Sequence, residues 1–517
     1  MIVKKLLIIF FVSALCVGAK DFSIVSYNVE NLFDLEYDEN EYKEYHPNTL
    51  TWNRLALEKK VDNISRVLLE LDADIVALQE IESSEALGYL LKKLPKYKYW
   101  EFSKKQQSSV GVATLSKYPI VKSKHLDVDK LDRYSRNILA TTFVIDQKKF
   151  VVYNNHWRSK RAAESHRIVY AMALFNEIKK LSKDEDYIVL GDLNSNYNEY
   201  FTFKYEERLN DTKGITGINQ VLNTTIEGNF VQKYNITQYE KPVHYNTWLE
   251  LPSNERFSAK FRGENTTPDN ILLPRALFDD KNIWYIDKSF SVFKPHYLYK
   301  NFKIVRWDLF KHKGYSDHLP IVARFSTTPQ NYNFKSEKYL ATLDTLYKVQ
   351  QIDNFALKEM LVIYNRDKVS IVKHKDQNIS DKAIMLFGAS NEFVVGGVYD
   401  FKVQQLNNYN GLKEITNVSN VEKKDALHSF KEYYLDAKKI DIFDMQYQNN
   451  IVTNLSGFYK KGYLHFSKNG KYEKIRVYFK KGVKRPKDGS NITILSGHLG
   501  IYRGVIQIVI YSKHDFN

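Results

Sequence analysis

Short apolar runs alternate with helical patterns between residues 22 and 325, and this alternation constrains the fold more than any other feature. Four of the runs are SIVSYNV (23–29), ADIVALQE (73–80), FVVYNNHW (150–157) and DYIVLGDLN (186–194). Two stretches place apolar side chains on one face of a helix: Leu57, Val61, Ile64, Leu68 and Leu71, and then Ile168, Ala171, Phe175, Ile178 and Leu181. Strands that alternate with helices predict a layered α/β architecture.

Each of these apolar runs ends in polar side chains that can bind a cation or a phosphate. The residues at the run ends are Asn28, Glu80, Asn154, Asn155, His156, Asp192 and Asn194. Because strands of this kind bring their carboxyl ends to one edge of a sheet, we expect these groups to lie together. Asp317 and His318 precede the run LPIV (319–322), and they join the same edge if that strand is antiparallel to its neighbour. The sequence therefore predicts one site whose residues are spread along the chain.

The chain becomes rich in β patterns after residue 326. Residues 327–340 begin with TTPQNYNF, lose apolar content and predict a linker. Beyond it, residues 396–415 and 489–508 share glycine, leucine and tyrosine positions at a constant offset of 93. We expect two tandem small β-barrels, at residues 341–430 and 440–517. A shared hairpin sequence is the alternative explanation, because Tyr-x-Gly before an alternating strand is a common turn.

The second of these expected barrels is strongly basic. Residues 451–517 contain 13 Lys and Arg against three Asp and Glu. In KYEKIRVYFKK (471–481), the apolar residues Ile475, Val477 and Phe479 alternate with Lys474, Arg476, Tyr478 and Lys480. Such a strand face suits stacking on bases with phosphates held nearby, although an ordinary solvated face is the alternative. We hypothesise that Lys474, Arg476 and Lys480 tether a polymeric substrate.

The first 19 residues have the organisation of a secretory signal. Lys4 and Lys5 precede an apolar run (6–12) and a small-residue cleavage site (17–19). We therefore expect a cleaved signal peptide over residues 1–19 and a secreted or periplasmic protein. A membrane anchor is the alternative, but this run is short for a bilayer, and no later segment looks transmembrane.

Composition narrows the chemistry further. Cleavage would remove Cys16, the only cysteine, so the exported chain would have no disulfide and no thiolate ligand. A lipid anchor on Cys16 fits poorly, because Leu15 stands where a small residue is needed. The chain carries 76 basic and 61 acidic residues, a net charge of +15, or +13 without Lys4 and Lys5. This balance favours a polyanionic partner, either nucleic acid or anionic lipid.

Six motifs resemble, in order, those of the endonuclease/exonuclease/phosphatase superfamily, which includes deoxyribonuclease I. They are SYNVENLF (26–33), ALQEIE (77–82), NNHWRSK (154–160), LGDLNS (190–195), TPDNILL (267–273) and YSDHLPI (315–321). The resemblance covers nearly all of residues 22–325. It implies a deoxyribonuclease I-like catalytic domain over residues 20–326, with a two-layered β-sandwich flanked by helices. The C-terminal half is similar, more weakly, to OB-fold modules attached to some secreted nucleases.

The resemblance also implies a role for each matching residue. Asn28, Glu80 and Asp317 would hold a divalent cation, Mg²⁺ with Mn²⁺ or Ca²⁺ as alternatives, because oxygen ligands suit a hard cation. The family's catalytic set would correspond to His156, Asp192, Asn194, Asp269 and His318. Asp192 and Asn194 would orient the attacking water and the phosphate, and the two histidines would contact phosphoryl oxygens and transfer protons. Asp269 would fix the tautomer of His318 through a hydrogen bond.

Basic residues beside these motifs are candidate substrate contacts. Arg136, in YSRNILATTF (134–143), resembles the family's arginine-bearing strand and would clamp a phosphate. The other candidates are Asn155, Arg158 and Lys160 in NNHWRSKRA (154–162). One position departs from the family pattern, because Asn270 follows Asp269 where many relatives have histidine. This change removes an imidazole near the site and puts the support of His318 in question.

These features together predict a secreted, monomeric, metal-dependent nuclease that hydrolyses the phosphodiester bonds of DNA or also of RNA. A phosphatase or a phospholipase C-type phosphoesterase on the same fold is the first alternative, although TPDN stands where inositol-polyphosphate phosphatases have Trp-Cys-Asp-Arg. A non-catalytic protein that binds surfaces is the second alternative. A serine hydrolase is disfavoured, because the chain has no G-x-S-x-G motif.

Overall fold

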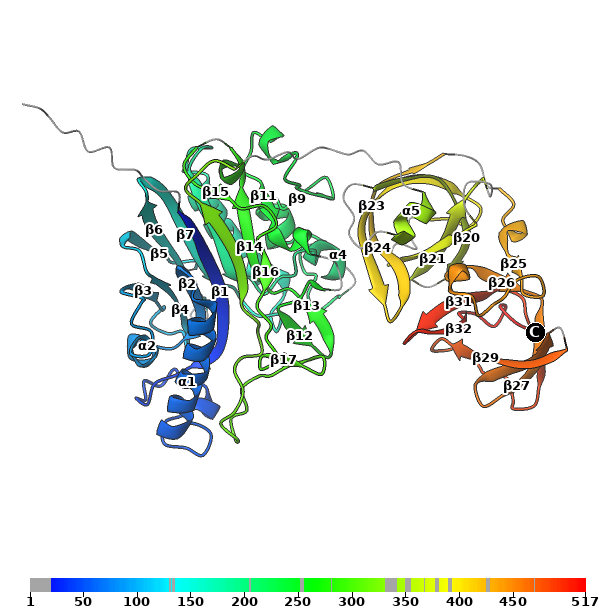
Figure 1. Cartoon of the computed structure of the whole chain (residues 1–517), viewed down its shortest axis with the longest axis horizontal. Helices are drawn as coiled ribbons and strands as arrows, with labels where there is room; N and C mark the ends of the chain where they lie inside the picture. Colours follow the sequence, from blue (N-terminus) through cyan, green and yellow to red (C-terminus); the bar gives the residue numbers. More distant parts are fainter. Residues whose placement is uncertain are drawn as a thin grey trace, which may run out of the picture.

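The computed structural model describes residues 20–517 except 130–131, 133–134, 204–205, 252–254, 280, 331–341, 349–354, 367, 377–380, 389–392, 425–427 and 469. The expected signal peptide (1–19) and most of the expected linker therefore lie outside the described residues. The described chain forms an α/β part followed by two all-β units (Figure 1). Among the described residues, no helix combines the length and apolar character needed to cross a bilayer.

The first sheet of the α/β part has the order β15-β19-β1-β2-β4-β3, with β16 also paired to β19. Its strands are β1 (Asp21–Leu32), β2 (Ile75–Ile81), β3 (Tyr99–Ser103), β4 (Gly111–Ser116), β15 (Trp284–Tyr285), β16 (Ser291–Val292) and β19 (Ile321–Ser326). β1 and β2 are parallel, and β19 runs antiparallel to β1. The start of β19 therefore lies at the same sheet edge as the ends of β1 and β2.

The second sheet has the order β11-β14-β8-β7-β6-β5. Its strands are β5 (Ile120–Leu126), β6 (Ile138–Ile145), β7 (Lys148–His156), β8 (Asp186–Asp192), β11 (His244–Asn246) and β14 (Asp269–Pro274). β7 and β8 are parallel, and β14 runs antiparallel to β8. The two sheets mirror each other, since each has a parallel central pair with an antiparallel strand beside it.

Apolar side chains fill the space between the two sheets. Phe22 of β1 stacks on Phe150 of β7 and on Phe325 of β19, with ring centroids 5.2 and 5.7 Å apart. Helices α1 (Arg54–Leu71) and α2 (Ser84–Leu91) pack on the first sheet, and α3 (Glu164–Ile178) packs on the second. The prediction of a two-layered sandwich flanked by helices is confirmed.

Both helical patterns read from the sequence form helices. In α1, Leu57, Val61, Ile64 and Leu68 are buried. Asn53 caps its first turn by accepting a hydrogen bond from the backbone of Ala56 at 3.2 Å. α3 ends at Ile178, so the last residue of the second pattern, Leu181, lies beyond the helix. The shorter elements of this part are α4 (Glu199–Phe203), β9 (Thr225–Ile226), β10 (Asn229–Phe230), β12 (Ala259–Phe261), β13 (Glu264–Thr266), β17 (Tyr299–Lys300) and β18 (Lys303–Ile304).

The first all-β unit is a closed five-stranded barrel with the order β20-β21-β22-β24-β23. Its strands are β20 (Phe355–Arg366), β21 (Val369–His374), β22 (Ala383–Phe387), β23 (Val398–Tyr409) and β24 (Leu412–Lys423), and α5 (Leu343–Lys348) packs against its core. Within the barrel β22 and β24 are parallel, and the other neighbouring strands are antiparallel. This architecture is consistent with an OB-like unit.

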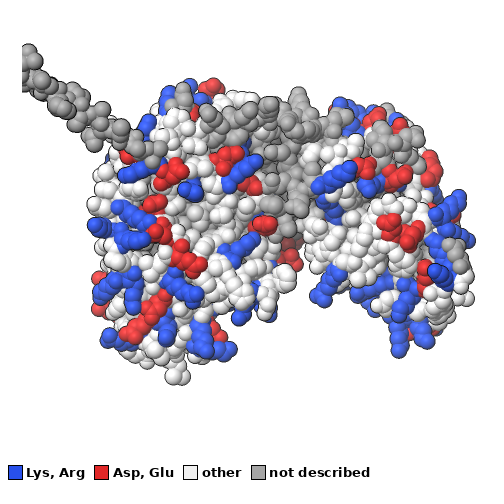
Figure 2. All heavy atoms as spheres, in the orientation of Figure 1, with Lys and Arg blue, Asp and Glu red and all other residues white. Residues whose placement is uncertain are grey.

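The second all-β unit repeats this strand order. Its strands are β25 (Leu435–Asp436), β26 (Ile451–Thr453), β27 (Leu455–Lys460), β28 (Tyr463–Lys468), β29 (Lys471–Phe479), β30 (Asn491–Ile494), β31 (Gly497–Tyr502) and β32 (Val505–Ile510). β26 and β27 flank Asn454 as one bent strand, which pairs with β31 at one end and with β28 at the other. β29 and β32 form the parallel pair of the barrel. The unit begins before the expected residue 440, because β25 pairs with β26. Figure 2 shows Lys and Arg side chains gathered over the lower part of this unit.

The repeat at offset 93 corresponds to one hairpin in each unit, β23–β24 in the first and β31–β32 in the second. Both turns place a non-glycine residue and then a glycine in the left-handed region: Asn410 (φ 53°) with Gly411 (φ 101°), and Arg503 (φ 53°) with Gly504 (φ 78°). Such two-residue turns suit the twist of the flanking strands. The repeated sequence therefore marks equivalent hairpins in the two β units.

Candidate active site

Irregularities in β1 and β2 direct two polar side chains to the shared sheet edge. The β1–β2 register shifts after Asn28, and the β2–β4 register shifts around Glu80, whose φ of 67° lies in the left-handed region. A bulge of this kind re-aims a side chain, and strained residues of this kind cluster at functional sites. The Nδ2 of Asn28 donates one hydrogen bond to Glu80 Oε1 and one to Asp192 Oδ2, each at 3.0 Å. Asn28 thus joins the two sheets at the site.

The parallel pair β7–β8 supplies the second group of site residues. His156 and Asp192 are register partners at the ends of these strands. The Nε2 of His156 lies 3.7 Å from Glu80 Oε1 and 3.7 Å from Asp192 Oδ2. Gly191 permits this arrangement, because its φ is 128° and a Cβ there would lie 2.1 Å from the carbonyl oxygen of Asn155.

Asn194 continues the chain from Asp192 into the site. Its backbone N–H donates to Asp192 Oδ1 at 2.8 Å, and its Nδ2 donates to the carbonyl of Trp157 at 3.1 Å. Its φ of 48° lies in the left-handed region. Asn194 therefore hydrogen-bonds Asp192, at the end of β8, and Trp157, the residue that follows β7.

His318 enters from the opposite direction along the chain, as the antiparallel strands require. Its Nδ1 lies 2.7 Å from Asp269 Oδ2, and Asp269 is the register partner of Asp192. Two serines complete the support: Ser316, inside the motif YSDHLPI, and Ser258, which lies outside all six motifs. Ser258 Oγ donates to the same Asp269 oxygen at 2.5 Å, and Ser316 Oγ donates to the carbonyl of Asn28 while accepting from the backbone of His318.

The charges at the site shift the pKa values of four groups. Burial and the nearby Asp317 raise the pKa of Glu80 to about 7. Burial also raises the pKa of Asp192 to about 6, although His318 opposes the shift. Burial, Arg136 and His318 hold the pKa of His156 well below its usual range. Burial alone would lower the pKa of His318, but Asp269, Asp192 and Asp317 raise it well above the ordinary value.

These shifts give the two histidines different protonation states near neutral pH. His156 is neutral and can accept a proton or a hydrogen bond through one ring nitrogen. His318 is cationic, with its Nδ1–H directed to the Asp269 carboxylate. The site therefore places a neutral imidazole and an imidazolium around one pair of buried carboxylates.

The residues present fit a hard divalent cation. Ligand atoms of Glu80, His156 and Asp192 lie within 4.8 Å of one another, as do those of Asp192, Asp269 and His318. Burial and mutual repulsion raise the pKa values of neighbouring carboxylates. A bound cation offsets this repulsion and stabilises the ionised forms. Asp317 belongs to neither group; its half-exposed carboxylate has Oδ1 4.0 Å from His318 Nε2 and acts on Glu80 at a distance.

The candidate substrate contacts divide into two classes. Arg136 lies beside the site: its Nη1 donates to the carbonyl of Trp157 at 3.1 Å, and its buried Nε has no partner among the described residues. Asn155 belongs to the second class, because it faces the protein interior. Its side chain is fully buried, its Nδ2 donates to two backbone carbonyls, and its Oδ1 accepts from the indole of Trp157.

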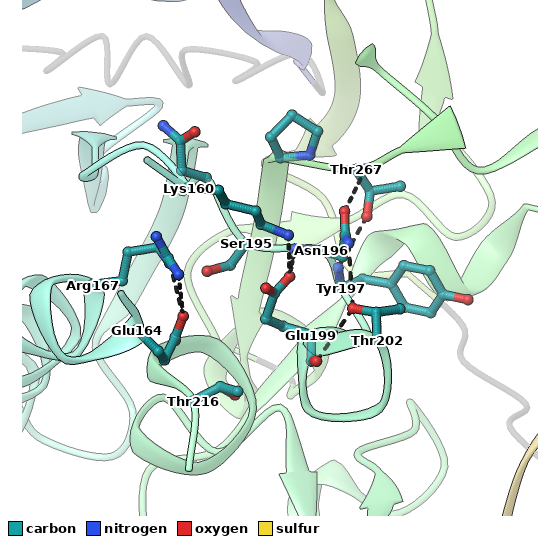
Figure 3. A network of polar contacts seen from close by, with 12 residues as sticks. Lys160, Glu164, Arg167, Ser195, Asn196, Tyr197, Glu199, Thr202, Thr216 and Thr267 are labelled. Carbon is teal, nitrogen blue, oxygen red and sulfur yellow. Dashed lines mark hydrogen bonds and ion pairs between the residues drawn. The ribbon is translucent and has the colours of Figure 1, made fainter. Parts of the chain in front are cut away.

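A buried polar network fixes the basic loop that carries Arg158 and Lys160 (Figure 3). Glu164 and Arg167 are fully buried and lie 2.7 Å apart. The Nη1 of Arg167 donates to the backbone carbonyls of residues 158, 159 and 162. Lys160 Nζ lies 2.6 Å from Glu199 Oε2, an oxygen of a fully buried carboxylate. The Lys160 side chain thus forms an ion pair with Glu199. Arg158 is half-buried, and Arg167 fixes the loop on which it lies.

Asn270 is a structural residue, which settles the question raised by its difference from relatives. Its Nδ2 donates to the carbonyls of Ser195, Thr267 and Pro268, and its Oδ1 accepts from Asn246. It does so from a fully buried position. His318 is supported by its neighbour Asp269 instead. Lys474 and Arg476 lie on β29 of the second barrel, Lys480 follows the end of that strand, and none of the three takes part in this cluster.

Residues 25–275 match the model of the Endonuclease/Exonuclease/phosphatase family. No curated protein matches the chain. A solved structure of D. rerio TDP2 complexed with single strand DNA product is 16% identical, with 59% of this chain and 98% of that chain covered and a TM-score of 0.39.

Two further solved structures are similar over the same share of the chain. ANGEL2, a 2',3'-cyclic phosphatase, in complex with adenosine-2',3'-vanadate is 16% identical, with 60% of this chain and 97% of that chain covered and a TM-score of 0.40. The endonuclease/exonuclease/phosphatase from Bacteroides vulgatus is 12% identical, with 59% of this chain and 98% of that chain covered and a TM-score of 0.37.

Proposed function

This chain belongs to the endonuclease/exonuclease/phosphatase family and is a phosphoesterase, and we propose that it is a Mg²⁺-dependent nuclease that hydrolyses the phosphodiester bonds of DNA. RNA is a second substrate of the same chemistry. The observation that supports this proposal best is the pairing of the His318–Asp269 couple with the Asn28–Glu80–Asp192 cluster at one edge of the two sheets.

Glu80 is the residue that would hold the cation, with the carboxylate of Asp192 and the neutral imidazole of His156 beside it. When bound there, a divalent cation supplies positive charge that offsets the charge growing on the phosphate during hydrolysis. Mg²⁺ is proposed because carboxylate oxygens dominate the site and Mg²⁺ prefers such hard ligands. Asn28 keeps the two carboxylates in place by donating to both.

The side chains around the phosphate then divide the remaining work. Arg136 is placed to bind a phosphate oxygen through its guanidinium. His318 presents its Nε2–H toward the site and can donate to a phosphoryl or departing oxygen, since Asp269 keeps it protonated. Asp192, with its pKa raised to about 6, is a carboxylate basic enough to take a proton from the attacking water. Asn194 holds Asp192 in position through its backbone N–H.

The preference for a polynucleotide rests on charge. The chain has a net charge of +15, and residues 451–517 carry 13 basic against three acidic residues. Phosphate contacts of this kind supply most of the affinity of proteins for nucleic acid. We also propose that residues 1–19 are a signal peptide and that the enzyme is secreted or periplasmic; N-terminal sequencing of protein recovered from the expressing cells tests this.

A plasmid-nicking assay tests the proposed activity. Purified protein should convert supercoiled to relaxed DNA with Mg²⁺, and both a chelator and His318→Ala should abolish this conversion. His166→Ala, at an exposed histidine on α3, is the matched control and should nick like the wild type. Hydrolysis of inositol phosphates or sphingomyelin without any action on DNA or RNA would establish the alternative phosphatase or phospholipase activity. No turnover of any phosphoester would favour a binding protein.

A further inference from the structure

We propose that one single strand of nucleic acid runs from the outer face of the second barrel, through the seam between the two barrels, to the catalytic site. This inference rests on the proposed function and names the form of its substrate. The path has three sections, and neighbouring sections have lining side chains in common.

The first section is the face made by β27, β28 and β29, called here the aromatic face. Its side chains are Phe458, Tyr463, His465, Tyr472, Lys474, Arg476 and Tyr478. The rings of Phe458 and His465 are stacked, with centroids 4.8 Å apart and planes inclined by 8°. The hydroxyl of Tyr472, a residue that is 66% exposed, lies 2.8 Å from His465 Nδ1. Flat exposed rings of this kind provide platforms on which unpaired bases stack.

Cations lie between these rings. Lys474 Nζ sits 5.2 Å from the centroid of the Tyr463 ring, and Arg476 is the register partner of Tyr463. The apolar residues of β29, Ile475, Val477 and Phe479, point into the barrel, so the predicted alternation of this strand is confirmed. Aromatic rings with interspersed cations match a single strand, whose bases and phosphates alternate. In an OB-type barrel the second and third strands, here β28 and β29, form the face that binds oligonucleotides.

The second section is the seam between the barrels. A cavity of about 560 Å³ opens there, and Arg476 and Tyr478 of the aromatic face also line this cavity, together with Lys480. Phe387 and Tyr409 line it from the first barrel. The two repeated hairpins meet beside it, since Gly504 donates a backbone hydrogen bond to Asn410 at 3.3 Å. A strand that leaves the aromatic face therefore enters a hollow lined by further aromatic and basic side chains.

The third section is a groove of about 970 Å³ between the first barrel and the catalytic domain. Phe387 and Tyr409 line this groove as well as the seam cavity, so the two hollows adjoin. In Figure 1 the β12–β13 hairpin faces β23 and β24, and Figure 2 shows an open notch between the two parts of the molecule. Gln405 of β23 bridges the parts, donating to Tyr197 Oη at 2.7 Å and accepting from Asn198 at 3.0 Å.

None of the catalytic residues is among the described residues that line the groove, but their neighbours in the chain are. Asn196 and Thr267 line its catalytic side, and the backbone of Thr267 donates to Asn196 Oδ1 at 3.0 Å. These residues lie two positions from Asn194 and Asp269 respectively. Lys260 also lines the groove, on a strand whose first residue, Ala259, forms a backbone bridge with His318. The catalytic wall of the groove is therefore continuous, through Ala259 and Thr267, with the segments that carry His318 and Asp269.

The composition of the groove favours unpaired bases over duplex DNA. Amide side chains from both walls line it, including Asn196, Asn265, Asn407, Asn408 and Asn417. Amides hydrogen-bond the edges of bases, whereas the acidic lining residues Glu206, Glu227, Glu264 and Glu414 oppose a dense array of phosphates. The groove also has the basic residues Arg256, Lys260 and Lys368, so its charges nearly balance, whereas Lys474 and Arg476 of the aromatic face lie among exposed rings. We therefore expect that face to supply affinity and the groove to orient the strand.

Binding measurements on the full chain in EDTA test this path without hydrolysis. An OB-type barrel covers about 4–16 nucleotides, so fluorescent thymidine oligomers of about 6 and about 20 nucleotides probe one barrel and the whole path. The double variant Tyr463→Ala/Tyr472→Ala should bind both lengths about 5- to 150-fold more weakly, as expected for one lost stacking contact or more. Tyr409→Ala should weaken binding of the long oligomer and leave the short one unchanged.

Salt dependence tests the cations of the path. Each phosphate contact on a single strand contributes about 0.7 to the slope of log K against log salt concentration. The triple variant Lys474→Ser/Arg476→Ser/Lys480→Ser should therefore lower the slope by about 2. Its control is Lys179→Ser/Lys180→Ser/Lys183→Ser, which removes the same charge near the end of α3 and before β8, at the opposite end of the second sheet from the site.

Three results would overturn the path. One is equal affinity for duplex and single-stranded DNA of the same length. Another is an equal loss of binding in the control triple variant and in the Lys474→Ser/Arg476→Ser/Lys480→Ser variant. The third is competition by poly-glutamate as strong as that by the thymidine oligomer, which would assign the surface to acidic polypeptides. Because EDTA prevents hydrolysis, a failure of the nuclease proposal would leave these binding results interpretable.

Discussion

Replacing Glu80 with glutamine should make the metal-free protein more stable at alkaline pH, although this residue belongs to the proposed metal site. The Glu80 carboxyl is buried beside Asp317, and its pKa rises from 4.5 to about 7. Its pKa in the folded state therefore exceeds its unfolded value. The folded state keeps a proton that the unfolded chain releases between about pH 4.5 and pH 7, so the carboxyl costs stability as the pH rises through that window.

The magnitude follows from the shift. One pKa unit corresponds to about 1.36 kcal/mol, so the shift of Glu80 costs at most about 3 kcal/mol above pH 7. Glutamine keeps the hydrogen bond from Asn28 to the Oε1 position and carries no charge. In EDTA at pH 8, we therefore expect the free energy of unfolding of Glu80→Gln to exceed that of the wild type by up to about 3 kcal/mol. Near pH 4.5 the two free energies should be equal. Added Mg²⁺ should stabilise the wild type most at pH 8 and should not stabilise the variant.

Urea denaturation between pH 4.5 and pH 8, with and without Mg²⁺, measures these differences. Glu207→Gln, at an exposed carboxyl, is the control and should follow the wild type at each pH. A Glu80→Gln protein that is less stable than the wild type at pH 8 in EDTA would refute the reasoning, because it would show that the ionised carboxylate is favourable in the folded protein. A difference between the two proteins that does not change with pH would refute it as well.

Two further substitutions test the geometry around the site. Asp269→Asn should lower kcat about 10- to 100-fold and move the alkaline loss of activity to lower pH, because the carboxylate raises the pKa of His318. A pH–rate profile on an oligonucleotide measures both effects. An alkaline limb at the same pH as in the wild type would contradict this prediction. Gly191→Ala should destabilise the protein by at least about 2 kcal/mol in urea, because its Cβ would lie 2.1 Å from the Asn155 carbonyl oxygen. Gly228→Ala, at a φ of 76° with open space around the Cβ, should cost only about 1 kcal/mol, and equal costs would show that the contact is unimportant.

The sequence was most informative where a residue's position along a strand decides its location. Buried runs that end in polar residues predicted a common edge, and the structure brings Asn28, Glu80, Asp192 and His318 to that edge. This works because buried strands must pair, and parallel and antiparallel pairing then decide which strand ends meet.

The sequence is least informative where the direction of a side chain matters. Asn155 is adjacent to His156, yet neighbouring residues of a strand point to opposite faces, and Asn155 lies buried against β8 and Trp157. The alternation of β7 was therefore a usable signal for excluding Asn155. No comparable signal reveals the partner of Lys160, because Glu199 lies 39 residues away at the start of α4. The same holds for Ser258 and its bond to Asp269.

The bridge made by Gln405 has a consequence for how a polymer enters the enzyme. Two neutral hydrogen bonds from one amide exchange with water at small net cost, and interfaces between domains are usually mobile unless they are large and apolar. If these bonds open and the barrels move away from the catalytic domain, a strand can enter the groove from the side. An enzyme that loads sideways in this way needs no free terminus, so closed circles of single-stranded DNA would be accepted as readily as linear molecules.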